Sequence, residues 1–301
     1  MLSVVKNFES KRIYLASQCW GTNVKGIICL SKHPTTIMSY FTFLIKSSSI
    51  AFFNVDEIIT SHSSIFLLPL FGKILGKRVI LIDFGDWPQI MYYKLLFILG
   101  SKAATLFAKF FELIRFILAS IVDEYYTNSP KVYMEMRGRA KFHARYALAI
   151  IEDLRRFYAH SCRRSKRRAG LLYVGRLDSE KGVDRLLRAY VRARRFNVPL
   201  VIVGDGPLRK LVCRLSQRVP GIVYVGALPY ERVFEYYATY RYVVIPSYSE
   251  GFPRVLLEAL MCHNEILIFK ELEIFKRFAS RVFSGENELV DFIRSMPNVT
   301  T

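Results

Sequence analysis

Residues 171–182 read LLYVGRLDSEKG, the clearest indication of fold in this 301-residue chain. Four apolar residues end at Gly175, a charged loop follows, and apolar residues then recur at helical spacing over 183–191. Further short apolar runs, most of them separated by helical patterns, lie at residues 200–203, 222–225, 242–245 and 266–269. Such an alternation predicts a parallel sheet with helices on both faces, and sheets of this kind bind ligands at the carboxyl ends of their strands.

The first half of the chain repeats the pattern less cleanly. It predicts a helix at 65–75 and strands at 12–17, 57–61, 78–83 and 124–128. The expected fold class is α/β, with two Rossmann-like domains whose parallel sheets face each other across a cleft. We expect an N-terminal domain at 1–157 and a C-terminal domain at 170–301. The arginine-rich stretch 158–169 between them is read either as a solvated linker or as a patch that contacts phosphate or lipid.

The composition narrows the class of partner. Apolar residues make up 52% of the chain, which excludes a globally disordered protein. The net charge of +19 suits an anionic partner such as nucleic acid, acidic phospholipid or a phosphorylated substrate. We expect no nucleic-acid partner, because no RNA-recognition, zinc-finger or helix-turn-helix pattern is present. The five cysteines form no CxxC pair, and we expect no metal site.

The expected location is cytoplasmic, with association with the cytoplasmic face of a membrane as a further expectation. Residues 1–12 are too charged for a signal peptide, and the longest charge-free run, 58–72, is shorter than the ~18 residues that a spanning helix needs. In a predicted helix at 103–122, the charged residues Lys109, Glu112 and Arg115 fall on one narrow stripe of an otherwise apolar surface. Such a helix is either buried between a sheet and its neighbours or lies in a membrane interface.

The loop 175–182 carries residues suited to phosphate. A junction between a strand and a helix offers backbone N–H groups and a positive dipole end to an anion. Arg176 and Lys181 add two cations, five residues apart. The alternative interpretation is an ordinary turn with surface charges.

A second segment, 250–258, follows the run at 242–245. Pro253 suits the first turn of a helix, and the carboxylates of Glu250 and Glu258 lie before it and about two turns later. This geometry suits an extended ligand whose diphosphate lies at the helix N-terminus and whose hydroxyl groups at either end donate to the two carboxylates. The alternative is a capping glutamate and a helix-surface glutamate.

Four motifs occur in the order GRLDSEKG at 175–182, VGDGP at 203–207, VYVGALP at 223–229 and PSYSEGFPRVLLEAL at 246–260. In this order and spacing they resemble the retaining glycosyltransferases of family 4, which have the GT-B fold. The resemblance is specific across residues 171–260. It implies that the C-terminal domain binds a nucleotide-sugar and that the N-terminal domain binds the acceptor.

The reaction implied by the resemblance is transfer of a hexosyl-type sugar from a UDP-, GDP- or ADP-sugar to an acceptor, with retained anomeric configuration. Arg176 and Lys181 match the pair that grips the donor diphosphate. Glu250 matches the catalytic carboxylate that contacts the sugar hydroxyls, and Glu258 matches the glutamate that binds the ribose.

The resemblance also implies that the backbone of Gly251 and Phe252 cradles the phosphates and that residues near Gly226 border the base. The fixed cations and the helix end stabilise the charge that builds on the leaving diphosphate. We therefore expect no metal and no cofactor besides the donor substrate.

The first domain departs from the family pattern. The loop expected near the donor phosphates holds one glycine, Gly21, where the family often has two. At a position where the family often has a histidine, Asp86 is the best candidate to face the donor sugar and Asp83 the second. The alternative is that both aspartates only shape a turn at the end of a strand.

Two functions remain open at this stage. The first is a glycosyltransferase whose acceptor is a lipid-linked or membrane-proximal glycan, as the basic first domain and the apolar helix suggest. The second is a non-catalytic binder of nucleotide-sugar or glycan on a decayed GT-B scaffold, as the departures in the first domain suggest.

Overall fold

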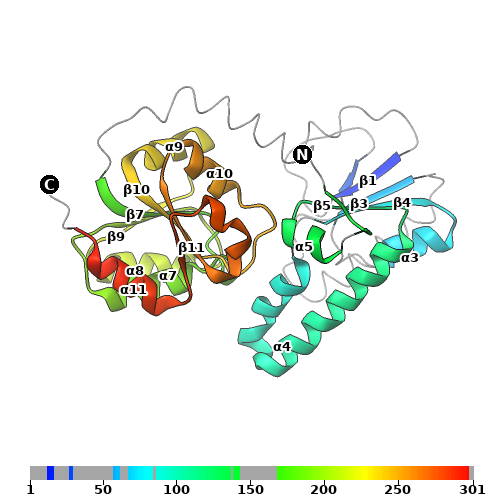
Figure 1. Ribbon diagram of the computed structural model, residues 1–301, viewed down its shortest axis with the longest axis horizontal. Coiled ribbons are helices and arrows are strands. Elements are labelled where there is room, and N and C mark those ends of the chain that lie inside the picture. The colour runs from blue at the N-terminus through cyan, green and yellow to red at the C-terminus, as the bar shows by residue number, and fades with distance from the viewer. Residues whose placement is uncertain are drawn as a thin grey trace. The chain divides into compact units, whose positions relative to one another are not determined.

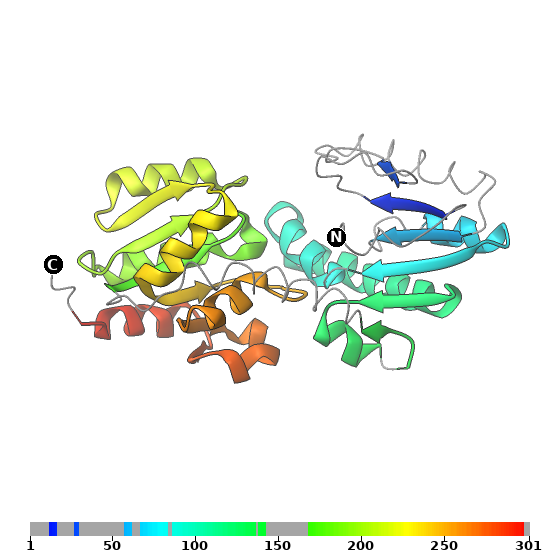
Figure 2. The same ribbon diagram turned by 90° about the horizontal axis from the view of Figure 1, so that it is seen from above.

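The computed structural model describes residues 12–16, 27–29, 57–61, 67–83, 86–136, 138–142 and 168–297 (Figures 1 and 2). The chain divides into two compact units, Met1–Ala147 and Leu148–Thr301. In the described residues each unit contains a six-stranded sheet. Most of the stretch 158–169 lies outside the described residues, and strand β7 begins at Arg168. The predicted domain boundaries therefore stay predictions.

The sheet of the first unit has the strand order β2-β1-β3-β4-β5-β6, and each neighbouring pair is parallel. Its strands are β1 (Arg12–Ala16), β2 (Ile27–Cys29), β3 (Glu57–Ser61), β4 (Arg78–Asp83), β5 (Glu124–Thr127) and β6 (Lys141–Phe142). The four strands predicted from the sequence are confirmed to within a residue at either end. The two strands that were not predicted, β2 and β6, are the shortest, and two or three residues show no periodicity.

The helices of this unit are α3 (Leu67–Ile74), α4 (Trp87–Ile121) and α5 (Pro130–Glu135). Helix α4 is interrupted at Gly100, whose φ of 76° belongs to the left-handed region that glycine tolerates. Figure 1 shows the two halves of α4 running in different directions from this turn, which lies away from the strands. No helix in the described part of the chain is both long and apolar enough to span a bilayer.

The second half of α4, residues 101–121, has a buried face and an exposed apolar face. Ile114 and Leu118 pack with Leu81 and Tyr125 in the core of the unit. The side chain of Arg115 is buried, although the sequence placed it on a polar stripe. Burial of the whole helix, one of the two interpretations, is wrong, because six large apolar side chains of this half are exposed.

The sheet of the second unit has the strand order β12-β11-β10-β7-β8-β9, again with every pair parallel. Its strands are β7 (Arg168–Val174), β8 (Leu200–Val203), β9 (Ile222–Gly226), β10 (Tyr240–Ile245), β11 (Glu265–Phe269) and β12 (Arg281–Phe283). The five apolar runs predicted as strands are confirmed. The runs in β8, β10 and β11 are buried throughout, because helices cover both faces of the sheet, whereas β9 lies at the edge of the sheet and is buried only at Ile222.

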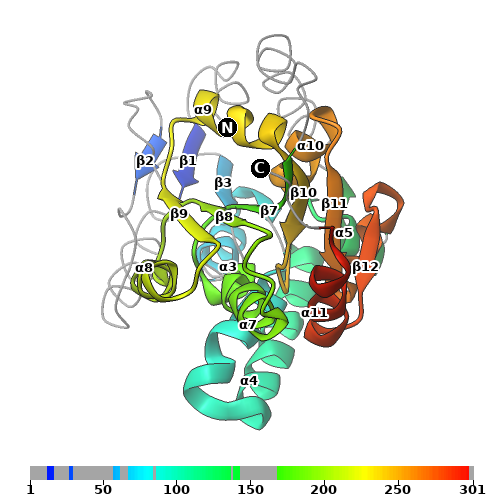
Figure 3. The same ribbon diagram turned by 90° about the vertical axis from the view of Figure 1, so that its left-hand side faces the viewer.

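Helices α9 and α10 cover one face of this sheet, and α7, α8 and α11 cover the other (Figures 1 and 3). The helical elements are η2 (Ser179–Lys181), α7 (Val183–Ala193), α8 (Arg209–Arg218), α9 (Tyr230–Thr239), α10 (Arg254–Met261), η3 (Lys270–Phe278) and α11 (Glu286–Ser295). Leu171, Ile202 and Val244 of the sheet pack with Leu186 of α7 and Ile293 of α11 in one buried core.

The direction in which the chain crosses this sheet reverses between β7 and β10. From β7 the chain continues outward through β8 and β9, and it then returns to β10 on the other side of β7 and continues through β11 to β12. The loops that follow β7 and β10 therefore leave the sheet in opposite directions. A crevice at the carboxyl ends of two such strands is the usual ligand site of an open α/β sheet.

Candidate functional site

The loop after β7 is built to hold Lys181 at this crevice. The Asp178 side chain accepts a hydrogen bond from the backbone N–H of Glu180 and so caps η2. Gly182 then has a φ of 67°, and a Cβ at this position would lie 1.9 Å from the carbonyl oxygen of Pro246. Only glycine fits there, because helix α7 begins directly against the loop that follows β10.

Direct hydrogen bonds join the two motif loops. The backbone N–H of Tyr248 donates to the carbonyl of Glu180 at 3.0 Å. The guanidinium of Arg185 donates to the carbonyl oxygens of Pro246 and Ser247 at 2.6 and 2.9 Å. Segments about 65 residues apart in the sequence are thus held together at one edge of the sheet.

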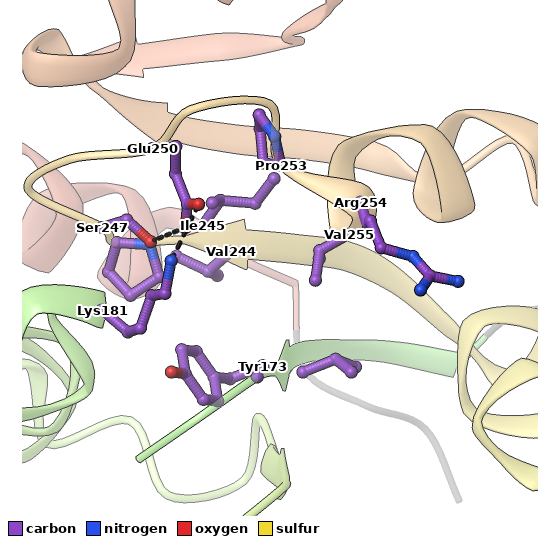
Figure 4. Close-up of a pocket in the computed structure, with 12 residues that line it drawn as sticks. Tyr173, Lys181, Val244, Ile245, Ser247, Glu250, Pro253, Arg254 and Val255 are labelled. Carbon is purple, nitrogen blue, oxygen red and sulfur yellow. Dashed lines mark hydrogen bonds and ion pairs between the residues drawn. The ribbon is translucent and has the colours of Figure 1, made fainter. Parts of the chain in front are cut away.

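A pocket of about 140 Å³ lies at this edge (Figure 4). Its lining comes from the ends of β7 and β10, from Lys181 and Glu250, and from the first residues of α10. This volume is smaller than the ~300–1,000 Å³ typical of small-molecule sites. It suits one part of an extended ligand, such as its phosphates.

Lys181 and Glu250 face each other in the pocket. The ammonium nitrogen of Lys181 lies 2.8 Å from Oε2 of Glu250 and 3.8 Å from Oε1 of Glu180. Burial lowers the pKa of Lys181, but these two carboxylates outweigh it, so the net shift raises the pKa above its usual value. The hydroxyl of Ser247 donates to Oε1 of Glu250 at 2.7 Å and fixes that carboxylate. Figure 4 shows the side chains of Lys181 and Glu250 pointing toward one another from separate loops.

Glu258 belongs to a neighbouring buried cluster and does not line the pocket. Its Oε2 accepts a hydrogen bond from the hydroxyl of Tyr237 at 2.7 Å, and its Oε1 lies 3.8 Å from Nε of Arg254. Burial raises the pKa of Glu258, and the hydrogen bond from Tyr237 and the charge of Arg254 oppose the shift. Arg254 lines the pocket, but its guanidinium points away from the Lys181–Glu250 pair (Figure 4).

The remaining predicted residues of this unit lie outside the pocket lining. Arg176 is half exposed and forms ion pairs with Asp178 at 3.2 Å and Glu180 at 3.3 Å. Phe252 follows Gly251 in the bend before α10, and its ring packs edge-on against Phe275. Gly226 ends strand β9 with a φ of 87°, and a Cβ at this position would meet open space.

In the first unit, Asp86 is held in a buried ion network. One of its carboxylate oxygens lies 3.0 Å from the guanidinium of Arg115 and the other 2.6 Å from the ammonium of Lys131. Arg115 also pairs with Glu135 at 3.0 Å. Both oxygens of Asp86 already accept from cations, so its catalytic role stays a prediction. The other residue predicted in this unit, Gly21, lies outside the described residues.

Asp83, the second aspartate, ends β4 and is fully buried. Its Oδ2 accepts a hydrogen bond from the hydroxyl of Tyr125 at 2.9 Å. Burial raises the pKa of Asp83 to about 7, although this hydrogen bond and the charge of Arg115 act in the opposite direction. The side chain is therefore a carboxyl group that titrates near neutral pH.

Sequence reasoning missed Arg185, which holds the loop after β10. Besides its two carbonyl acceptors, it forms an ion pair with Glu271 at 3.1 Å and lies over the rings of Tyr248 and Phe269. The available signal was weak: a charged residue directly before the apolar pair Leu186-Leu187 of an expected helix. The described residues contain no group of three or more His, Cys, Asp or Glu side chains placed to bind a metal ion.

Residues 159–278 match the family of glycosyl transferases group 1. The chain is 39% identical over 89 residues to a putative teichuronic acid biosynthesis glycosyltransferase, TuaC, of Bacillus subtilis, a match that covers 30% of this chain and 21% of the relative. It is 34% identical over 93 residues to a Campylobacter jejuni protein, N-acetylgalactosamine-N,N'-diacetylbacillosaminyl-diphospho-undecaprenol 4-alpha-N-acetylgalactosaminyltransferase. That match covers 31% of this chain and 25% of the relative. These matches therefore concern a part of each relative.

Among solved structures, the chain is similar to the sucrose-phosphate synthase of Thermosynechococcus elongatus, with a TM-score of 0.55 and 19% identity. The similarity covers 89% of this chain and 73% of that structure. At this identity the likeness concerns the fold alone. It confirms the predicted α/β class of GT-B type, with two parallel-sheet units.

Proposed function

We propose that this chain, whose residues 159–278 match the glycosyl transferases group 1 family, is a retaining glycosyltransferase that takes its sugar from a nucleotide-sugar. The observation that carries the proposal is the Lys181–Glu250 pair, 2.8 Å apart, in a pocket where the chain reverses its crossing of the sheet. Both residues belong to motifs that resemble family 4.

Lys181 is suited to the diphosphate of the donor. An ammonium group has three N–H donors, so Lys181 can contact Glu250 and an anion in the pocket at once. The first turn of α10 borders the same pocket and adds its dipole. When the bond between the sugar and the β-phosphate oxygen breaks, negative charge grows on that oxygen, and a cation already in place lowers the barrier.

Glu250 is suited to the sugar of the donor. Its carboxylate accepts from Lys181 and Ser247, and each carboxylate oxygen can accept a further hydrogen bond. Sugar hydroxyls are donors of the right kind. Arg176 would serve the diphosphate after leaving its ion pairs with Asp178 and Glu180, and Glu258 would accept from the ribose.

The acceptor in this proposal is a lipid-linked or membrane-proximal glycan, and the reaction needs no metal and no additional cofactor. The name of the Campylobacter relative includes a diphospho-undecaprenol substrate, which supports a lipid-linked acceptor. We place the reaction at the cytoplasmic face of a membrane.

The alternative function is a non-catalytic binder of nucleotide-sugar or glycan. One observation favours it: Arg115 and Lys131 already occupy both oxygens of Asp86, the first-unit residue proposed for catalysis. In that case the donor would bind at Lys181 and Glu250 without turnover.

A thermal-shift screen against UDP, GDP, ADP and their sugar conjugates tests the donor class. A ligand that binds only the folded chain raises the unfolding temperature, and the rise grows with the logarithm of the ligand concentration divided by its dissociation constant. We expect one nucleoside diphosphate and its sugar conjugate to stabilise the wild type and Lys276→Ala, an exposed lysine of η3, but not Lys181→Ala. Equal stabilisation of all three proteins would overturn the proposal.

A further inference from the structure

The second half of α4 presents a continuous apolar face to solvent. Six side chains, each between 43% and 70% exposed, form it: Leu106, Phe107, Phe110, Leu113, Phe116 and Ile117. Leu106, Phe110, Leu113 and Ile117 follow the spacing of one helical face. The opposite face of the helix packs on the core of the unit. The six exposed side chains, called the apolar stripe below, take no part in that core.

A row of cations borders the stripe. Lys102 and Lys109 are exposed and lie two helical turns apart, on the same side of α4. Two turns further along the same line is Phe116, and the guanidinium of Arg139 lies over its ring, 4.3 Å from the centroid. Leucine and phenylalanine beside a line of basic side chains is the pattern of a helix that lies in the plane of a membrane interface.

The charge of the chain argues for lipid over a second copy of the same protein. The net charge is +19, so two copies repel each other, whereas an anionic bilayer attracts the chain. Long basic side chains also extend their methylene groups along apolar surface while their charged ends reach lipid phosphates.

We propose that residues 101–121 dock on the surface of an anionic bilayer, with Leu106, Phe110, Leu113 and Ile117 in the boundary between headgroups and acyl chains. Lys102, Lys109 and Arg139 then contact lipid phosphates. The helix lies along the surface. Docking does not depend on the proposed sugar transfer, so either can fail without the other.

Co-sedimentation with vesicles of phosphatidylcholine containing about 30% phosphatidylglycerol tests the docking. The wild type is expected to bind them, to bind pure phosphatidylcholine at least about tenfold more weakly, and to dissociate as salt is added. The variant Leu113→Ser/Ile117→Ser should lose at least about tenfold in affinity. Its matched control is Ile274→Ser/Phe278→Ser, two exposed apolar residues of η3 with the same spacing, which should bind like the wild type.

The basic row has a separate test. Lys102→Gln/Lys109→Gln should weaken binding to the anionic vesicles by about fivefold per residue and reduce its dependence on salt, whereas Lys276→Gln/Arg277→Gln should not. Because all four double changes are at exposed positions, unchanged circular dichroism verifies folding. Equal vesicle binding by Leu113→Ser/Ile117→Ser and its control overturns the proposal. So does a wild-type dimer in sedimentation equilibrium that Leu113→Ser/Ile117→Ser converts to monomer, because the stripe then binds a second copy.

Discussion

The ammonium of Lys181 lies 2.8 Å from the carboxylate of Glu250, although the two residues come from loops that follow different strands. The strands β7 and β10 are neighbours in the sheet, and their loops leave in opposite directions. In the proposed function, Lys181 would contact the phosphates of the nucleotide-sugar and Glu250 would accept hydrogen bonds from the sugar hydroxyls.

The first prediction separates the two roles. Lys181→Ala should weaken binding of the nucleoside diphosphate and of its sugar conjugate alike, by about 1.5–3 kcal/mol, because both carry the diphosphate. Glu250→Ala should weaken binding of the sugar conjugate far more than that of the bare diphosphate. Isothermal titration calorimetry measures both, with Lys276→Ala and Glu273→Ala, an exposed ion pair of η3, as controls. The role assignment is refuted if both site variants weaken the two ligands equally.

The second prediction concerns Arg185, which positions the loop that carries Ser247 and Glu250. Arg185→Met leaves the carbonyls of Pro246 and Ser247 without this buried donor and leaves the partly buried Glu271 without its cation. It should destabilise the second unit by about 3–5 kcal/mol. Both tryptophans, Trp20 and Trp87, belong to the first unit, so urea unfolding is followed by far-UV circular dichroism.

The matched control is Arg188→Met, three residues further along α7. Arg188 is half exposed and pairs with Asp184 and Glu286, so its loss should cost about 1 kcal/mol or less. Arg185→Lys should restore part of the stability and part of the nucleotide affinity. A loss as small for Arg185→Met as for Arg188→Met would show that Arg185 does not support the loop.

The third prediction tests the close approach of the two loops. Gly182→Ala places a Cβ 1.9 Å from the Pro246 carbonyl oxygen and should destabilise the second unit by about 3 kcal/mol or more. Gly226→Ala, also at a positive φ but facing open space, should cost only the ~1–2 kcal/mol of a left-handed alanine. Urea midpoints from circular dichroism compare the two, and similar losses would contradict the close approach.

The fourth prediction uses the titration of Asp83 in the first unit. The pKa of its carboxyl is about 7 in the folded chain and near 3.8 when unfolded, so the folded state binds the extra proton between these pH values. The free energy of unfolding should therefore fall as pH rises from about 4 to 7, by roughly 2–4 kcal/mol. Tryptophan fluorescence during urea unfolding follows this unit.

Asp83→Asn is the control, because an amide keeps an acceptor for the hydroxyl of Tyr125 and does not titrate. Asp83→Asn should remove most of the fall in the free energy of unfolding between about pH 4 and 7. Glu124 acts in the opposite direction at the acid end of this range, because hydrogen bonds from Tyr126 and Lys141 lower its pKa from 4.5 to about 2 and its stabilisation is lost as pH falls below about 5. The wild type and Asp83→Asn share this contribution, so the difference between their two curves isolates Asp83. The account of Asp83 is wrong if the free energy of unfolding depends on pH in the same way for the wild type and Asp83→Asn.

Much of the second unit could be predicted from its sequence, because each buried parallel strand is a continuous apolar run and the runs before 175, 204 and 226 each end at a glycine. The break in α4 was not predicted, because the sequence indicated a helix only at 103–122, which begins after the left-handed turn at Gly100. Periodicity also could not show which face of residues 101–121 is buried, since Leu113 and Leu118 have the same chemistry.

The candidate site, too, could be predicted only in part. The sequence could place Lys181 and Glu250 near one edge of the sheet, because both follow strands that are neighbours there, but it did not predict the ion pair between them. Their functional roles stay predictions. The sequence could not show that Arg176 pairs with Asp178 and Glu180, or that Arg115 and Lys131 hold Asp86. Those contacts depend on side-chain conformations and on helices distant in the sequence.

The most direct test of the proposed function is release of nucleoside diphosphate from the nucleotide-sugar that the thermal-shift screen selects. The wild type should turn it over, by hydrolysis or by transfer to a glycan acceptor, and so should the control Glu273→Ala. Glu250→Ala should lose turnover by about a hundredfold or more. A wild type that binds the nucleotide-sugar at Lys181 and never releases the diphosphate, with any acceptor offered, would contradict the account and leave a binding protein.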